Sequence, residues 1–310
     1  MKKILIGSWL MLQVFGLVLQ AQAQSTNDWK ANDLQGKVKQ IHQRVYKSRK
    51  KNGEIKLIRV KAEQKMIFDK DGFLTASMYR YLGYGGNGKW KSTKYLYNKK
   101  QQCIGFKKYN GEKLVSSCEY KLKRGQIVTQ KYLDEQGQVL GITSYKKNKK
   151  GLVLEEKMTK ADGTIVQKTI YKYDRKQRLV YEKGWSNEKF KYEHKTTYLN
   201  KLERTIKKFD EAGKLTGFYN ENEKATSEGK TVTTQYYDVP QKLTKKGIDQ
   251  YNAQGAQVLR RVFNADGSEQ KYNYMLYEYK YDQQNNWVRQ IEFLSNGNTL
   301  DISFREITYY

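Results

Sequence analysis

The stretch Phe68-Asp69-Lys70-Asp71-Gly72-Phe73-Leu74 decides the fold of this chain, because its pattern recurs along the sequence. An aromatic residue is followed by Asp or Asn, and Gly or a substitute for it comes three residues after that. A type I turn favours Asp or Asn at its first position and Gly at its fourth. Each copy therefore predicts the bend of a hairpin between two strands. The clearest further copies are residues 173–179, 209–215 and 281–287, and shorter ones lie at 97–101, 133–137, 148–151 and 251–255.

The segments between these turns alternate in the way that strands do. Tyr277, Tyr279 and Tyr281 predict one face of a strand, and Glu278 and Lys280 the other. The turns lie about 12 to 18 residues apart where the pattern is clearest, which predicts strands of about five to seven residues. The expected fold is therefore all-β: an extended, twisted antiparallel β-meander of repeated hairpins, forming a single-layer or partly curled sheet.

The N-terminus has the three parts of a secretory signal peptide. Lys2 and Lys3 precede an apolar run, and Ala21-Gln22-Ala23 provides a small-residue cleavage signal. The alternative is a retained membrane anchor, but the run is shorter than the roughly 20 residues that span a bilayer. The predicted organisation is a signal peptide over residues 1–23, an N-terminal tether over 24–33 and a β-hairpin repeat array over 34–310. No transmembrane segment is expected after cleavage.

The chain is strongly basic. Its net charge of +27 falls to +25 when the leader, with Lys2 and Lys3, is removed. Such a surface attracts anionic polymers. The alternative is that lysines only keep the strands soluble and protect sheet edges from pairing. The 26 tyrosines provide apolar bodies for a thin core while their hydroxyls stay hydrated.

The two cysteines give a test of the strand register. A two-residue loop at Asn110-Gly111 would place Cys103 directly opposite Cys118. Facing residues of antiparallel strands have Cα atoms about 4.5 to 5.5 Å apart, within disulfide range. Because an exported chain meets an oxidising compartment, a disulfide between Cys103 and Cys118 is predicted. The alternative is two free buried thiols.

The recurring phrase resembles the YD repeat of RHS-type bacterial proteins. The stretch Tyr109-Asn110-Gly111-Glu112-Lys113-Leu114 is similar to the shorter MORN-like repeats, and the opening and closing segments resemble small secreted bacterial repeat proteins. This resemblance implies an extended or curling antiparallel sheet with a role in surface display, carbohydrate contact or partner binding. Large RHS proteins enclose a toxin in their shell, and this chain is too short for that function.

The sequence predicts no catalytic residue, no cofactor and no metal site. His42 and His194 are the only histidines, and neither has cysteines at zinc-ligand spacing. A secreted hydrolase, such as a glycosidase with two convergent carboxylates, remains an alternative. Glu155 and Glu156 are adjacent, so on a strand they would point to opposite faces.

The densest cluster of aromatic and basic residues is the predicted binding face. Rings interleaved with cations can stack against sugars while the cations hold acidic groups. The alternative is that these tyrosines form the core of the sheet. Trp287 and Arg289 are expected to share one face. The predicted face consists of Tyr277, Tyr279, Tyr281, Trp287 and Arg289.

The expected function is binding, by an exported non-catalytic repeat protein of the periplasm or cell surface. The partner would be an anionic polymer, either acidic polysaccharide or lipopolysaccharide, or an envelope protein. Export and the lack of a recognisable nucleic-acid module argue against nucleic acid. A structural module of an envelope assembly, without a soluble ligand, is the alternative.

Overall fold

The structure is a computed structural model that describes residues 28–310, apart from residues 53, 84, 271–273 and 295–298. The predicted signal peptide and its cleavage site lie outside the described residues. The described chain is all-β and antiparallel, as predicted, and forms one sheet of 20 strands. A single helical turn, α2 (Asp28–Ala31), precedes the first strand.

The strands run from 7 to 15 residues, longer than the sequence predicts. Their bounds are β1 (Val38–Lys51), β2 (Glu54–Phe68), β3 (Leu74–Tyr81), β4 (Lys91–Tyr97), β5 (Cys103–Asn110), β6 (Lys113–Lys123), β7 (Gln126–Asp134), β8 (Val139–Lys147), β9 (Val153–Lys160), β10 (Ile165–Tyr173), β11 (Leu179–Ser186), β12 (Lys189–Tyr198), β13 (Glu203–Phe209), β14 (Leu215–Thr226), β15 (Gly229–Asp238), β16 (Lys242–Asn252), β17 (Gln257–Asn264), β18 (Met275–Tyr281), β19 (Trp287–Leu294) and β20 (Thr299–Tyr309).

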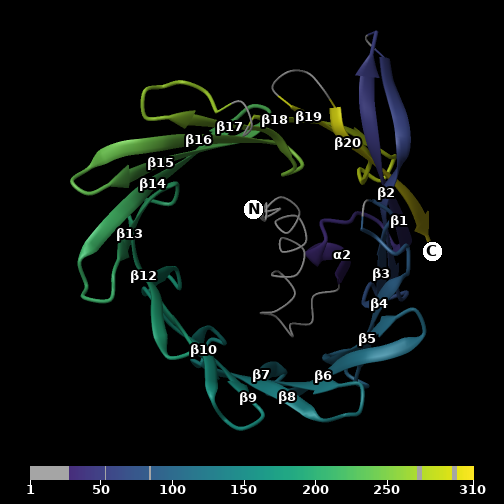
Figure 1. Ribbon diagram of the computed structural model, residues 1–310, viewed down its shortest axis with the longest axis horizontal. Helices are drawn as coiled ribbons and strands as arrows, with labels where there is room; N and C mark the ends of the chain where they lie inside the picture. The colour runs from purple at the N-terminus through teal and green to yellow at the C-terminus, as the bar shows by residue number, and fades with distance from the viewer. Residues whose placement is uncertain (1–27, 53, 84, 271–273, 295–298) are drawn as a thin grey trace.

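The sheet closes into a barrel. Consecutive strands pair in order around the ring, and β1 pairs with β20 as well as with β2 (Figure 1). In this seam Ile41 faces Ile307, and Val38 faces Tyr309. The predicted meander of hairpins is therefore confirmed, but the prediction of an extended or partly curled sheet is wrong. Closure removes the two open edges, whose unpaired backbone groups would otherwise remain available for pairing.

The recurring phrase forms hairpin turns, as the sequence predicts. At the first copy, Gly72 N donates to Asp69 O (3.0 Å), and Asp69 Oδ1 accepts from Asp71 N and Phe73 N (3.0 and 2.9 Å). Gly72 has φ +88°, so a type I turn is followed by a left-handed residue. Further turns repeat two of these contacts. The backbone carbonyl of the first turn residue accepts from the amide three residues later, and its side-chain oxygen accepts from the amide four residues later. These first residues are Asn98, Asp134, Asn148, Asp174, Asp210, Asn252 and Asp282.

The two faces of the barrel wall differ in chemistry. Helix α2 lies inside the ring (Figure 1), and the Tyr97 hydroxyl donates to Asp28 of this helix (3.2 Å). Tyr97 and Tyr95 therefore face inward. Because paired residues share a face, the register extends this assignment around the ring. The inner wall includes Tyr120, Tyr132, Tyr145, Tyr171, Tyr192, Tyr219, Tyr236, Tyr277, Tyr279 and Tyr281, and the outer wall includes Lys94, Lys107, Lys131, Lys146, Lys157, Lys168, Lys172, Lys183, Lys195 and Lys207.

The main apolar core lies where α2 meets the seam. Trp29 Nε1 donates to Val38 O (2.6 Å), and Leu74 N donates to Asp28 Oδ2 (2.6 Å), so α2 is held to β1 and to the start of β3. These bonds fix the part of the predicted tether that the structure describes against the inner wall. The buried cluster consists of Trp29, Leu34, Val38, Ile41, Met66, Phe68 and Leu74.

The predicted disulfide is absent, and Cys103 and Cys118 are free thiols. The two-residue loop consists of Gly111 and Glu112 rather than Asn110 and Gly111, with Gly111 at φ +64°. An extra residue in β6 then shifts the register again. Cys118 consequently faces Phe106, and Cys103 faces Tyr97 on the other neighbouring strand.

Candidate functional site

The predicted binding face is divided by a bulge in β19. Tyr277, Tyr279 and Tyr281 follow one another on the inner wall. Trp287 faces Tyr281, but Arg289 faces Lys280, because one extra residue separates the two pairs. Trp287 therefore joins the three tyrosines, whereas Arg289 lies on the outer wall. The prediction that Trp287 and Arg289 share a face is wrong.

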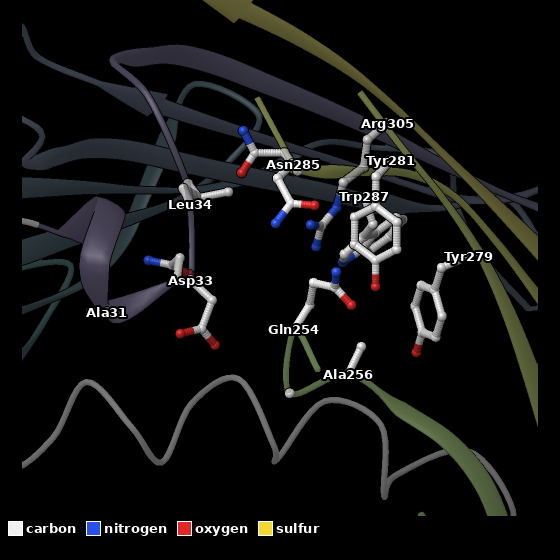
Figure 2. Close-up of a pocket in the computed structure, with 13 residues that line it drawn as sticks. Ala31, Asp33, Leu34, Gln254, Ala256, Tyr279, Tyr281, Asn285, Trp287 and Arg305 are labelled. Atoms are coloured by element: carbon white, nitrogen blue, oxygen red, sulfur yellow. The ribbon is translucent and has the colours of Figure 1, made fainter. Parts of the chain in front are cut away.

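Two tyrosines of this face line a pocket at the rim where β1 begins. The pocket has a volume of about 370 Å³ and lies between α2 and the inner wall (Figure 2). Tyr279 and Tyr281 of β18 form part of its wall, together with Trp287 at the start of β19 and Arg305 of β20. Pockets of about 300–1,000 Å³ are typical of small-molecule sites.

The chain after α2 closes the pocket on the opposite side. Asp33 and Leu34 lie there, facing the turn that contains Gln254 (Figure 2). Gln35 N donates to Asn286 Oδ1 (2.8 Å), and Asn286 Nδ2 donates back to Gln35 O (2.8 Å). These reciprocal bonds hold this segment to the β18–β19 turn, so both sides of the pocket are fixed.

Arg305 provides the positive charge among the described residues that line the pocket. Its guanidinium carbon lies 3.4 Å from the centre of the Trp287 ring, and its Nε donates to Gln43 Oε1 (3.0 Å). Among the described residues, no carboxylate lies within ion-pair distance of Arg305. Desolvation lowers the pKa of Arg305 to about 9, so the side chain still carries its charge at neutral pH.

The tyrosine hydroxyls of the pocket have partners in the wall. Tyr279 donates to Gln257 O (3.0 Å) and accepts from Gln290 (2.9 Å), and Tyr281 accepts from Asn252 (2.9 Å). Burial raises the pKa of Tyr279, which keeps its hydroxyl protonated. These bonds fix the two rings where they line the pocket.

A second candidate surface, the outer strip, lies on the outer wall of β10 to β13. Lys195 Nζ lies 4.3 Å from the centre of the Phe209 ring. The Nζ atoms of Lys168 and Lys183 lie 5.9 and 5.5 Å from the centre of the Trp185 ring. Cation–π contacts of this kind place cations beside apolar ring surface. The outer strip consists of Lys168, Lys172, Lys183, Lys195 and Lys207 with Tyr181, Trp185, Phe190 and Phe209.

Acidic side chains only partly neutralise the outer strip. Glu155 pairs with Lys168 (3.7 Å) and with Lys146 beside the strip (3.0 Å). Glu193 pairs with Lys183 and Lys195 (3.0 and 3.3 Å). Each carboxylate therefore serves two lysines, and the strip keeps an excess of positive charge.

Arg305 is the residue that sequence reasoning missed. It lies in the last strand, 18 residues after Trp287, and no local pattern connects the two. The pairing of β20 with β1 and β19 brings Arg305 beside Gln43 and Trp287. The alternation of β20 could have assigned a face to Arg305, but only closure of the barrel identifies its neighbours.

Within the described part of the chain, no helix is long and apolar enough to cross a membrane. No group of three or more His, Cys, Asp or Glu side chains there could hold a metal ion. In particular, His42 and His194 lie on opposite walls.

The chain matches no protein-family model and no curated protein. Among solved structures it is similar to a porin-like protein from Bacteroides uniformis, with 10% identity over 87% of this chain and 96% of that chain and a TM-score of 0.34. A porin-like protein from Bacteroides vulgatus gives 13% identity over 88% and 98% of the two chains, with a TM-score of 0.28.

Proposed function

We propose that this chain is an exported, non-catalytic barrel protein that binds an anionic polymer, acidic polysaccharide or lipopolysaccharide, at the cell envelope. The observation that supports this function is the excess of lysines over carboxylates among the rings of the outer strip. Rings can stack on sugar faces while neighbouring cations hold acidic groups. Export in this proposal depends on the signal peptide predicted over residues 1–23.

The lysines of the outer wall favour water rather than lipid as the surroundings of the barrel. A lysine facing lipid costs about 2–4 kcal/mol at the midplane of a bilayer. Lys94, Lys107 and Lys131 extend this charge over strands beyond the outer strip. The proposed function therefore places the outer wall in contact with an aqueous polymer.

Retention on immobilised polygalacturonate, with neutral dextran as the reference matrix, tests this function. The mature chain should bind polygalacturonate and elute as salt rises. The test variant combines Lys172→Gln, Lys195→Gln and Lys207→Gln. By counterion release, each contacting lysine removed should lower the slope of log affinity against log salt by about 1.

A matched control removes the same charge elsewhere. Lys70, Lys99 and Lys149 are exposed turn residues at the rim, and their combined change to Gln should leave elution nearly unchanged. Equal loss in both triple variants would show that only net charge matters and would overturn the assignment to the outer strip. Absence of retention by the unaltered chain would overturn the function itself.

A further inference from the structure

We propose that the pocket beside α2 binds a carboxylate-bearing monosaccharide, a uronic acid, with Arg305 holding the carboxylate. This site lies on the inner wall, opposite in face to the outer strip, and it does not depend on the polymer-binding function. The ligand would be either a free sugar acid or the end unit of an acidic chain.

The charge of the pocket favours an anion beside Arg305. Among the described residues, Gln43 Oε1 is the one hydrogen-bond acceptor of this guanidinium, which leaves its terminal N–H groups available. Guanidinium groups bind carboxylates through two parallel hydrogen bonds. A carboxylate in this position would also offset the desolvation that acts on Arg305.

Arg305 is held in place before any ligand arrives. The Trp287 ring covers one side of the guanidinium at 3.4 Å, and Gln43 fixes its Nε. Such preorganisation reduces the entropy that a ligand must overcome on binding. Because Trp287 is occupied by Arg305, the stacking surface left for a ligand is provided by Tyr279 and Tyr281.

The polar groups of the pocket favour a sugar over an aromatic acid. Gln254 and Asn285 carry amides that can both donate to and accept from hydroxyl groups. Asp33, the one carboxylate among the described lining residues, lies across the pocket from Arg305 (Figure 2) and can accept from sugar hydroxyls. A ring with an acid at one end and hydroxyls at the other matches this arrangement.

Isothermal titration of the whole mature chain with D-glucuronate, and with glucose as the neutral match, tests the proposal. Glucuronate should bind at least about tenfold more tightly than glucose, because only its carboxylate can form charge-assisted hydrogen bonds with Arg305. Arg305→Gln should abolish this preference, and Arg305→Lys should keep part of it. Equal binding of the two sugars, or no binding of glucuronate, would overturn the proposal.

Gln254→Ala provides a second variant, because Gln254 lies on an exposed turn and its loss leaves the barrel wall intact. It should weaken glucuronate binding severalfold without removing the preference over glucose, so the proposal stays testable if Arg305→Gln does not fold. Unchanged binding in Gln254→Ala and Arg305→Lys would contradict the site.

Two further measurements distinguish a free sugar acid from the end unit of an acidic chain, and binding in this pocket from binding at the outer strip. In the triple lysine variant of the outer strip, binding of galacturonate oligomers that is lost with Arg305→Gln would indicate an end unit, and binding of the monosaccharide alone would indicate a free acid. The triple lysine variant of the outer strip should bind glucuronate normally. Loss of polygalacturonate retention alone therefore reports on the proposed function, and loss of the glucuronate preference alone reports on this pocket.

Discussion

Glu155 and Glu156 are neighbours in β9, yet their carboxylates lie on opposite walls of the barrel. Glu155 faces Lys146 and Ile170 on the outer wall, and Glu156 faces Tyr145 and Thr169 on the inner wall. The hydrogen bond from Lys146 lowers the pKa of Glu155, and desolvation raises the pKa of Glu156. One strand therefore separates a basic, hydrated surface from a tyrosine-rich, partly desolvated one.

These opposite shifts predict opposite effects of the same substitution. The lowered pKa of Glu155 stabilises the fold above the unfolded value of 4.5, and this stabilisation is lost as the pH falls through the folded pKa. Glu155→Gln should therefore lower the free energy of unfolding at pH 7 by about 0.2–1 kcal/mol. Urea unfolding at pH 7 and at pH 3 measures this, and a cost that persists at pH 3 would contradict the electrostatic explanation.

Glu156→Gln should have the reverse effect. A carboxyl with a raised pKa destabilises the fold as the pH rises from 4.5 through the folded pKa, because the buried charge is unfavourable. The substitution should therefore raise the free energy of unfolding at pH 8 and have little effect at pH 4. Equal effects of Glu155→Gln and Glu156→Gln would mean that the two side chains do not lie on different walls.

The seam between β1 and β20 predicts a cross-link. His42 faces Glu306, so His42→Cys with Glu306→Cys should form a disulfide within one chain after mild oxidation. The background is Cys103→Ser with Cys118→Ser, and peptide mapping detects the link. Lys107→Cys with Glu306→Cys is the control and should not link. In an open sheet the first pair would lie on opposite edges and would stay reduced.

The left-handed turn residues predict a graded change in stability. Gly213 has φ +79°, and nothing lies within 4 Å of the Cβ that Ala would add. Gly213→Ala should therefore cost about 1 kcal/mol through backbone strain alone. Gln177 holds the equivalent position at φ +64°, so Gln177→Gly should relieve the backbone strain and stabilise the fold. The gain should be smaller than the cost of Gly213→Ala, because Gly also raises the conformational entropy of the unfolded chain. Thermal unfolding that is unchanged in Gly213→Ala would contradict this turn geometry.

The two thiols predict a simple labelling result. Iodoacetamide should label both Cys103 and Cys118 in unfolded, unreduced protein, with the same mass as after reduction. In the folded protein Cys118 should react very slowly, because it is 1% exposed and desolvation raises the pKa of its thiol to about 12. A chain that takes up label only after reduction would show that the cysteines are bonded.

The hairpin turns could be predicted because their chemistry is local. Asp210 and Gly213 lie within one turn, and each has a physical role that its residue type shows directly. The same holds for strand alternation, which identified Tyr277, Tyr279 and Tyr281 as one face. These features need no knowledge of distant residues.

The bulges could not be predicted, and they changed the candidate sites most. The loop at Gly111 and Glu112 moved Cys118 from Cys103 to Gly105, and an extra residue at Val115 moved it on to Phe106. Another extra residue at Val288 separated Trp287 from Arg289. A shift of one residue exchanges the two faces of a strand. The barrel wall is tyrosine-rich on one face and lysine-rich on the other, and both residue types have amphipathic side chains. The alternation in the sequence therefore does not show where a bulge inserts its extra residue.

Folding of this chain involves two kinds of strand pairing, local hairpins and the closure of the seam between β1 and β20. Among the described residues, every other pairing between two strands joins neighbours in sequence. Such hairpins form within about 1–10 μs. Joining β1 to β20 instead closes a loop that includes almost the whole chain, although each doubling of loop length adds only about 0.6 kcal/mol of entropy cost. We expect the amides of β1 and β20 to gain protection from hydrogen exchange last during refolding, with the hairpin array already assembled.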